Sequence, residues 1–468
     1  MNEKCIVYGI EVSIAAFSYD PEDPYIIKIV KDFNEYAKEN NLDIQLNNIL
    51  LSSHNTTVLN VGYASTVETW LRKKQTDYDI FTMNTIYTSR FAKYSADLKK
   101  YVSKDLIDSY SKGIASKIGY YKDKLVGLPL YVDVGVLFSN RELIDKYNQT
   151  LPKTWNELID SAEYIVEKEK EIGNNDIIGY IGHMPDGESS ICSSLEFIYS
   201  FRDSIESDMP GFRSDNALRA FKMIKEIKNK LSSDSNFILN DMNTAITIIS
   251  GKVVFGKFWY GEYGDLYISQ LPGEKAGVSA SCVGGRNLIV NNYVSEERKI
   301  ASAKVIEFLL SKKLQIKYVL ENGKHSGLDD VYYDEELCSK YKCEPFRNMQ
   351  FIPRPSPSLM SYDEYSLKYI SLFTNYLYGN ETAENTLKQI DYLTSIYYIE
   401  NNSTIGRTVI FVTSSILFIM FFTYIIVLSN KYKIYFCRYN KMIWSSMFVG
   451  LFIYISQNYF LIGELTEL

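Results

Sequence analysis

Residues 1–400 alternate between strand-like and helix-like stretches of apolar residues. Ile6–Ala16 is rich in Val, Ile and Ala, which predicts a strand, and Leu42–Leu51 predicts a second one. Between them, Tyr25–Glu39 carries apolar residues at the spacing of an amphipathic helix, and Tyr78–Met83 predicts a short buried strand. Strands that alternate with helices predict an α/β fold with a mainly parallel sheet and helices on both faces.

The ends of two predicted strands mark a place for a ligand. In open sheets of this class, ligands bind beyond the carboxyl ends of the strands. The pattern therefore predicts that Ala16–Tyr19 and Phe81–Asn84 lie beside any pocket.

Further along the chain, helix boundaries are visible in the sequence. Thr154 and Glu157 have the spacing of a capping box, which predicts the start of a helix. Before it, Leu125–Asn140 is an extended run, and later Gly323 predicts the end of another helix.

Two uncharged apolar runs of 21 residues, Thr408–Leu428 and Ile443–Gly463, follow this region. Each is long enough to cross about 30 Å of hydrocarbon as a helix. Residues 429–442 between them are rich in Lys and Arg, which predicts a cytoplasmic loop and an extracellular location for residues 1–400. The sequence thus predicts a multi-pass plasma-membrane protein, with a juxtamembrane linker at 401–407 and a short extracellular end at 464–468.

Glycosylation sequons agree with this topology. Five N-x-Ser/Thr sequons precede the first apolar run, and they become glycosylation sites if the region enters a secretory lumen. The predicted sites are Asn55, Asn148, Asn380, Asn401 and Asn402. A clear signal peptide does not precede them, because Glu3 and Glu11 interrupt the apolar stretch. This indicates that the start is incomplete or that Met1 is not the true start.

Of the six cysteines, only Cys338 and Cys343 lie close together in the sequence. Such a pair closes a small loop as a disulfide in an oxidising compartment, and the alternative is two free thiols in a turn. We favour the disulfide because the other features place this part of the chain outside the cell.

Composition and motifs exclude several classes of function. The net charge is −7 and the pI is near 5.4, so nucleic acid is not an expected partner. The three histidines, His54, His183 and His325, are too far apart for zinc-like spacing. The chain has no G-x-S-x-G, H-E-x-x-H, P-loop or G-x-G-x-x-G motif. We therefore expect no enzyme, no metal and no cofactor.

The order of longer motifs along the chain is more specific. They are VGLPLYVDVGVLFSN at 126–140, LPKTWNELIDSA at 151–162, ISGKVVFGKFWYGEYGD at 249–265, LPGEKAGVSASCVGGRNLIVN at 271–291 and KIASAKVIEFLLSKKLQIKYV at 299–319. This series resembles the family 1 extracellular solute-binding proteins. The resemblance implies a two-lobed periplasmic-binding-protein-like II fold with a hinge, crossovers near 129–135 and 260–270, and lobes that close on a ligand.

Sugars and oligosaccharides are the commonest ligands of that family, and they stack on aromatic rings and hydrogen-bond to polar side chains. On this basis the expected ligand-binding residues are Phe17, Tyr19, Asn84, Tyr131, Asp133, Trp259, Tyr260 and Arg286. Core packing is the alternative for the aromatic residues, and a salt bridge or a solvated surface is the alternative for Asp133 and Arg286. For Trp155, core packing is favoured, because it lies in the first turn of the capped helix.

Residues 430–468 resemble the first loop and second helix of the seven-helix domain in class C, GABA-B-like, G-protein-coupled receptors. That resemblance implies a receptor with a G protein as partner, but it covers only two of the seven helices. Two other functions stay open: a tethered binding subunit of a nutrient transporter, and a surface glycoprotein that binds no ligand.

Overall fold

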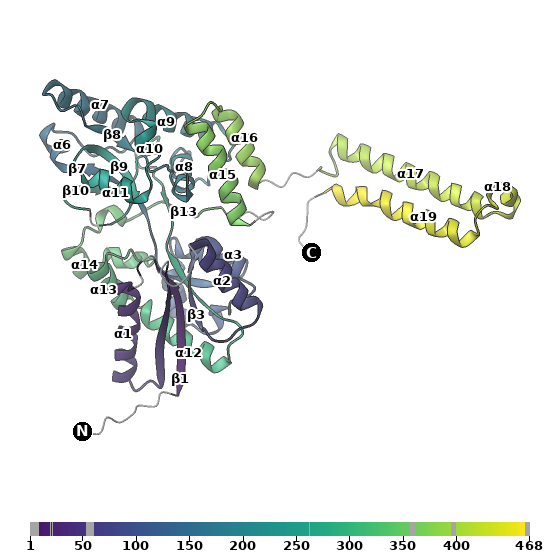
Figure 1. Cartoon of the computed structure of the whole chain (residues 1–468), viewed down its shortest axis with the longest axis horizontal. Coiled ribbons are helices and arrows are strands. Elements are labelled where there is room, and N and C mark those ends of the chain that lie inside the picture. The colour runs from purple at the N-terminus through teal and green to yellow at the C-terminus, as the bar shows by residue number, and fades with distance from the viewer. Residues whose placement is uncertain are drawn as a thin grey trace. The chain divides into compact units, whose positions relative to one another are not determined.

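The computed structural model describes residues 9–18, 20, 22–52, 60–261, 263–355, 361–394 and 399–463. The chain forms two compact units, residues 1–393 and residues 394–468. The first unit is built from two lobes, each with its own sheet (Figure 1).

Lobe 1 contains a five-stranded sheet in the order β2-β1-β3-β12-β6. Its strands are β1 (Ile10–Phe17), β2 (Ile44–Leu51), β3 (Ile80–Asn84), β6 (Gly127–Tyr131) and β12 (Arg286–Val290). The first three run parallel, whereas β12 is antiparallel to both β3 and β6.

Lobe 2 contains a four-stranded sheet in the order β10-β7-β9-β8. Its strands are β7 (Gly135–Asn140), β8 (Ile178–Ile181), β9 (Val253–Trp259) and β10 (Leu266–Ser269). Only β8 and β9 form a parallel pair. The prediction of a mainly parallel sheet is confirmed in strand direction, because in each sheet all strands but one run the same way. The reversed strands are β12 in lobe 1 and β7 in lobe 2, and each follows a passage of the chain from one lobe to the other.

The helices of lobe 1 cover its sheet. Helix α1 (Pro24–Glu39) begins one residue before the predicted Tyr25, with Pro24 in its first turn and Asp23 as its cap. Gly323 ends α13 in the left-handed conformation with a φ of 60°, as predicted. The other elements of this lobe are α2 (Asn60–Arg72), α3 (Thr88–Phe91), α4 (Lys104–Tyr110), α5 (Ala115–Ile118), β4 (Tyr120–Tyr121), β5 (Lys124–Leu125), α12 (Glu296–Leu309), α13 (Lys312–Asn322) and α14 (Glu335–Lys340). Cys338 and Cys343 are joined by a disulfide at the end of α14.

The helices of lobe 2 pack around the second sheet (Figure 1). They are α6 (Arg141–Lys146), α7 (Trp155–Glu171), α8 (Glu188–Ser200), α9 (Asp215–Leu231), α10 (Asp234–Phe237), α11 (Asp241–Ile249), α15 (Tyr362–Leu377) and α16 (Ala383–Thr394). The predicted capping box is confirmed: the Thr154 hydroxyl accepts from the backbone N–H of Glu157, whose carboxylate accepts from the backbone N–H of Thr154.

The chain passes between the lobes three times. The first passage joins β6 to β7 through residues 132–134, within the predicted crossover. The return passage does not lie at 260–270 as predicted, because β10 still pairs with β7 in lobe 2. It runs instead through β11 (Ser281–Cys282) into β12, and the third passage leaves β13 (Phe351–Ile352) for α15. β11 and β13 pair with each other as a parallel two-stranded ribbon.

The second unit contains two apolar helices that pack side by side. They are α17 (Thr404–Leu428) and α19 (Lys441–Ser456), with the short α18 (Lys433–Phe436) between them. Tyr424 on α17 contacts Ser445 and Phe448 on α19, with 2.9 Å between the two hydroxyl oxygens.

One helix in the described part of the chain, α17, is long and apolar enough to cross a membrane. The predicted second span, 443–463, is not one such helix. Regular α-helix ends at Ser456, and the chain continues from Gln457 as a 3₁₀ turn. The 16 residues of α19 rise only about 24 Å, less than the hydrocarbon core of a bilayer.

Candidate ligand-binding site

Four of the predicted site residues lie along one edge of the lobe 1 sheet. Arg286 opens β12 and pairs in register with Asn84 on one side and with Tyr131 on the other. This convergence follows from the topology, because antiparallel β12 begins at the edge where β3 and β6 end. Phe17 ends β1, the next strand across, where its ring lies 6.0 Å from that of Tyr63. The four side chains therefore begin from neighbouring positions on one edge, which we call the strand-end site.

Asp133 adds a carboxylate to the strand-end site from the first passage between the lobes. Its side chain is open to solvent, yet enough protein surrounds it that desolvation raises its pKa above the usual value. The positive charges of Lys324, Arg286 and Arg354 oppose that rise. The site thus offers one acceptor carboxylate near three cationic donors, a set that suits hydroxyl groups, which both donate and accept hydrogen bonds.

The Tyr131 ring is half-buried, and the positive charge of Lys324 lies over its face. The Lys324 Nζ atom is 4.6 Å from its centroid, and the Tyr25 ring meets it edge-on at 5.8 Å. Burial raises the pKa of Tyr131 to about 12, so its phenol stays protonated at neutral pH and can donate. The backbone of Gly285 passes close to the Tyr131 carbonyl with a φ of 100°, which no other residue adopts without strain.

Lobe 2 contributes Trp259, which ends β9 opposite Gly135 at the start of β7. The indole is half-buried, and the Lys257 Nζ atom lies 4.7 Å from its ring. Trp155 has a different environment: it is fully buried and its indole N–H donates to the Ser200 hydroxyl at 2.9 Å. The structure therefore confirms core packing for Trp155 and leaves Trp259 beside the passage between the lobes.

Two other predicted residues do not join this group. Tyr260 packs its ring against Phe346 at 4.7 Å and His325 at 6.3 Å, in an aromatic cluster of lobe 1. Its backbone N–H donates to the Val134 carbonyl at 2.8 Å. These contacts give Tyr260 a structural role at the passage. Tyr19 lies outside the residues that the structure describes.

Arg354 and Glu188 belong to the site, although the sequence did not predict them. Arg354 is buried in the third passage, where Nη2 donates to Asn84 of lobe 1 at 3.1 Å and Nη1 donates to Glu188 of lobe 2 at 2.8 Å. Glu188 also accepts from the hydroxyls of Tyr362 and Ser366. The only sequence signal was an arginine between Pro353 and Pro355, which indicates a rigid segment and no partner.

Cavities in the described residues lie beside the site and away from it. One of 180 Å³ opens next to Arg354 and is otherwise lined by hydroxyls, lysines and apolar groups, with no carboxylate. A larger one of 820 Å³ lies between α1 and α13, where charges pair with each other, as Lys317 does with Asp32 at 3.1 Å. None of the residues that line the larger cavity belongs to the strand-end site.

Among the described residues, His, Cys, Asp and Glu side chains nowhere gather in a group of three that could hold a metal ion. The sequon residues in the described part of the chain, Asn148, Asn380, Asn401 and Asn402, are all exposed. Their glycosylation remains a prediction, and Asn55 lies outside the described residues.

Residues 20–316 match the model of a family described as bacterial extracellular solute-binding protein. Two curated relatives are distant. A "Probable ABC transporter-binding protein" of Deinococcus radiodurans is 23% identical over 291 residues, which are 59% of this chain and 68% of the relative. A "Probable amino-acid ABC transporter periplasmic-binding protein" of Sinorhizobium fredii is 25% identical over 290 residues, 57% of this chain and 64% of that protein. The chain therefore spans less than two thirds of the second relative.

Solved structures share the two-lobed fold. Maltose-bound MalE3 of T. maritima superposes with a TM-score of 0.67 and 21% identity, and covers 82% of this chain and 98% of its own. The sugar-binding protein MalE of Xanthomonas citri gives 0.67 and 17%, over 82% and 96% of the two chains. A solute-binding protein of Agrobacterium radiobacter in complex with ribitol gives 0.62 and 18%, over 83% and 98%. The family match ends before α17, and none of these proteins supports the resemblance of residues 430–468 to class C receptors.

Proposed function

The chain belongs to the family of bacterial extracellular solute-binding proteins, and from this premise we propose that it captures a sugar or a polyol between its two lobes. Binding by lobe closure needs groups from both lobes that reach one solute. The reaction is reversible binding, with no covalent step.

One observation supports the proposal: polar and aromatic residues of lobe 1 converge on the strand-end site, and an aromatic residue of lobe 2 lies at the end of the passage that carries Asp133. In lobe 1, Asn84, Tyr131 and Arg286 lie in register, and in lobe 2 Trp259 pairs with Gly135, two residues after Asp133. Hydroxyl groups of a sugar would bond to the polar side chains, and its apolar ring face would lie on an aromatic ring. Asp133 lies in the first passage between the lobes, and its carboxylate would accept hydrogen bonds from hydroxyl groups of the solute.

Relatives of similar fold favour this ligand class. Three of the superposed proteins are described with maltose, with ribitol, or as sugar-binding. The Sinorhizobium fredii relative is instead described as an amino-acid binding protein, so amino acids are the competing class. An amino acid would bring its own carboxylate and ammonium, which Arg286 and Asp133 could pair.

Helix α17 supports membrane anchoring of the binding unit. Its apolar side chains, such as Phe411, Phe418 and Ile419, are more than half exposed within their unit. Such a surface is stable in hydrocarbon and costly in water. We therefore propose a tethered extracellular binding protein, which would either deliver solute to an ABC-type transporter or report its presence as a receptor.

Thermal unfolding of the full chain in detergent tests the binding proposal. Maltose, ribitol and mannitol would be compared with a set of amino acids. A ligand that binds only the folded state raises its stability by about 2.7 kcal/mol at 100 times its dissociation constant. A shift with a sugar or polyol that Asp133→Asn abolishes supports the proposal.

The control is Asp330→Asn, which changes the same charge at a position outside the strand-end site. It should unfold and respond as the unchanged chain does. A shift with amino acids alone would replace the ligand class. A well-folded chain that responds to none of these solutes would overturn the proposal.

A further inference from the structure

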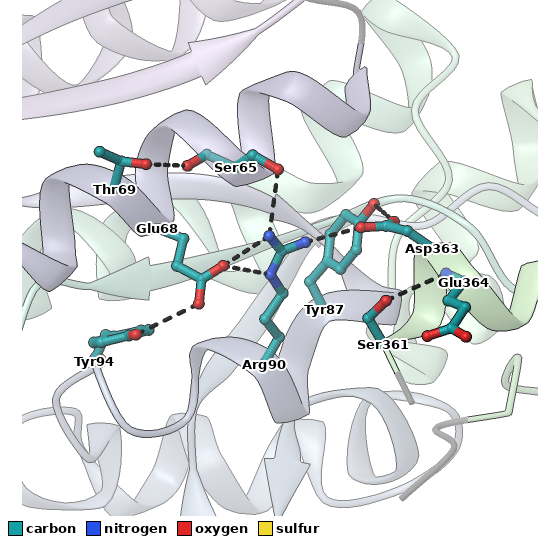
Figure 2. A network of polar contacts seen from close by, with 9 residues as sticks. All are labelled: Ser65, Glu68, Thr69, Tyr87, Arg90, Tyr94, Ser361, Asp363 and Glu364. Carbon is teal, nitrogen blue, oxygen red and sulfur yellow. Dashed lines mark hydrogen bonds and ion pairs between the residues drawn. The ribbon is translucent and has the colours of Figure 1, made fainter. Parts of the chain in front are cut away.

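A second set of contacts joins the lobes through residues that no ligand needs to touch. Arg90 lies on α3 of lobe 1, and Asp363 lies in the first turn of α15 of lobe 2. Arg90 Nη1 is 3.1 Å from Asp363 Oδ2, and the Tyr87 hydroxyl donates to Asp363 Oδ1 at 2.7 Å. Both oxygens of one lobe 2 carboxylate are therefore held by lobe 1. Figure 2 shows the guanidinium and the phenol converging on Asp363 from the same side.

The arginine is fixed on its own lobe before it reaches across. Glu68 on α2 binds Arg90 through one oxygen, with 2.9 Å to Nε and 2.7 Å to Nη2 (Figure 2). Arg90 Nη2 also donates to the Ser65 hydroxyl at 3.3 Å, and Tyr94 donates to the other Glu68 oxygen at 3.4 Å. A planar guanidinium held in this way loses little further freedom when it binds Asp363.

The environment makes this pair stronger than one on an open surface. The side chains of Arg90 and Asp363 are 24% and 27% exposed, so water screens them only in part. A carboxylate in the first turn of a helix is also favoured by the helix dipole. Burial, and next the bond to Asp363, raise the pKa of Tyr87, so its hydroxyl remains a donor at any physiological pH.

The same contacts connect to the strand-end site. The Tyr87 and Tyr362 rings meet edge-on at 6.4 Å, and the Tyr362 hydroxyl donates to Glu188. Glu188 binds Arg354, which binds Asn84. A gap between α3 and α15 would therefore also disturb the polar groups that face a ligand.

We propose that Tyr87, Arg90 and Asp363 form an interlobe latch that stabilises the closed lobes and so raises ligand affinity without touching the ligand. In a chain that is closed for only a fraction of the time, apparent affinity falls in proportion to that fraction. The latch raises the fraction before any ligand arrives. Its effect on affinity rests on the proposed function, whereas its effect on lobe closure does not.

The test measures lobe closure without ligand. Spin labels at Lys73→Cys on lobe 1 and Lys388→Cys on lobe 2 report the interlobe distance in the full chain, with Cys5 and Cys437 replaced by serine. Both label positions are exposed. Asp363→Asn keeps the shape and the Tyr87 acceptor but removes the charge. It should lengthen and broaden the distance distribution, with a change of about two- to fivefold in the ratio of closed to open lobes.

Glu364→Gln is the matched control. It removes the same charge from the same helical turn, but the ion pair that Glu364 forms among the described residues is within its own helix, with Lys368 at 2.7 Å. Its distribution should equal that of the unchanged chain. Asp363→Glu restores the charge and should recover part of the closure. If Asp363→Asn and Glu364→Gln leave the distance equally unaltered, the latch is wrong.

Maltose then separates the latch from the proposed function. Both proposals stand if two results are found. Maltose narrows the interlobe distance distribution of the unchanged chain, and Asp363→Asn weakens maltose binding by no more than the factor by which it changes the ratio of closed to open lobes. Opening by Asp363→Asn with no response to maltose or to the other solutes supports the latch and contradicts the proposed function. If maltose binds but Asp363→Asn changes neither lobe closure nor maltose affinity, the proposed function is supported and the latch is contradicted.

Discussion

Lys257 and Glu196 form an ion pair in the interior of lobe 2, with 3.2 Å between Nζ and Oε2 and side chains that are 2% and 1% exposed. Lys257 also donates to the Ser193 hydroxyl at 3.0 Å, and Glu196 accepts from the backbone N–H of Cys282 at 2.9 Å. The Lys257 Nζ atom lies by the Trp259 ring, so the pair supports the indole that lobe 2 holds beside the passage between the lobes.

The buried pair should be far more sensitive to the loss of one partner than of both. Lys257→Met leaves Glu196 charged without a counter-charge, or forces it to take up a proton, and should lower the free energy of unfolding by about 3–5 kcal/mol. The double variant Lys257→Met, Glu196→Leu should cost less than either single change. Chemical denaturation of the full chain measures each value, and additive costs would contradict a coupled pair.

Trp259 should contribute to ligand affinity and little to folding. Trp259→Ala removes the aromatic face and should weaken sugar binding by about 1–2 kcal/mol, or about 5- to 30-fold. Trp259→Phe keeps a smaller ring and should lose less. Titration calorimetry with the solute found by thermal screening gives the values. Trp155→Phe is the control: it removes the bond to Ser200 and should destabilise the fold with little effect on affinity. The opposite pattern would assign Trp259 to the core.

Glu188 should affect both the stability of the fold and ligand binding, because it binds Arg354. Glu188→Gln leaves the buried guanidinium with an amide in place of a carboxylate and should cost about 1–3 kcal/mol of stability. It should also weaken ligand binding, because Arg354 bonds to Asn84 at the strand-end site. Glu364→Gln, exposed in the first turn of α15, should change neither property. Unaltered stability and affinity in Glu188→Gln would remove Arg354 from the site.

Two buried histidines predict acid sensitivity. Burial lowers the pKa of His325 to about 3 and that of His183 to about 4, the latter against a bond with Asp241. Both would titrate near 6.5 in the unfolded chain, which therefore binds more protons than the folded chain between these values. Above about pH 6.5 these histidines therefore do not lower the free energy of unfolding, and the free energy of unfolding decreases as the pH falls below that value. At about pH 5 each histidine should lower the free energy of unfolding by about 2 kcal/mol relative to its value at pH 8.

Unfolding at the two pH values measures the effect, and His325→Phe isolates one contribution. The phenyl ring fits an aromatic cluster in which the His325 ring stacks on Tyr332 at 4.5 Å and lies 4.7 Å from Phe346. About half of the pH dependence should disappear in this variant. A pH dependence equal to that of the unchanged chain would show that acid acts elsewhere.

Sequence patterns predicted what depends on neighbours along the chain. Thr154 and Glu157 interact across one turn, so their spacing was sufficient. The predicted strands end at Ala16 and Met83, one residue before the observed ends at Phe17 and Asn84. The reversed direction of β7 and β12 was not predictable in this way, because it depends on where the chain crosses between lobes. Hydropathy also missed the break at Ser456, since the apolar composition continues into the 3₁₀ turn.

The polar network between the lobes was beyond such patterns for a different reason. Arg354 and Glu188 are 166 residues apart, and Arg90 and Asp363 are 273 apart. Each residue alone resembles an ordinary surface charge. Only the folded topology makes them partners, so composition and spacing carry no signal of them.

The parallel pairing of β11 with β13 restricts how the lobes can move. Ser281 and Cys282 lie beside Phe351 and Ile352, and the Val283 N–H donates to the Ile352 carbonyl at 3.1 Å. Two of the three connections are thus fastened together and must flex as one ribbon. A ribbon bends readily across its flat face and resists shear within its plane, so rotation about a single axis is the soft motion of the molecule. Opening should therefore follow one repeatable arc, along which every interlobe contact is broken and remade in the same order.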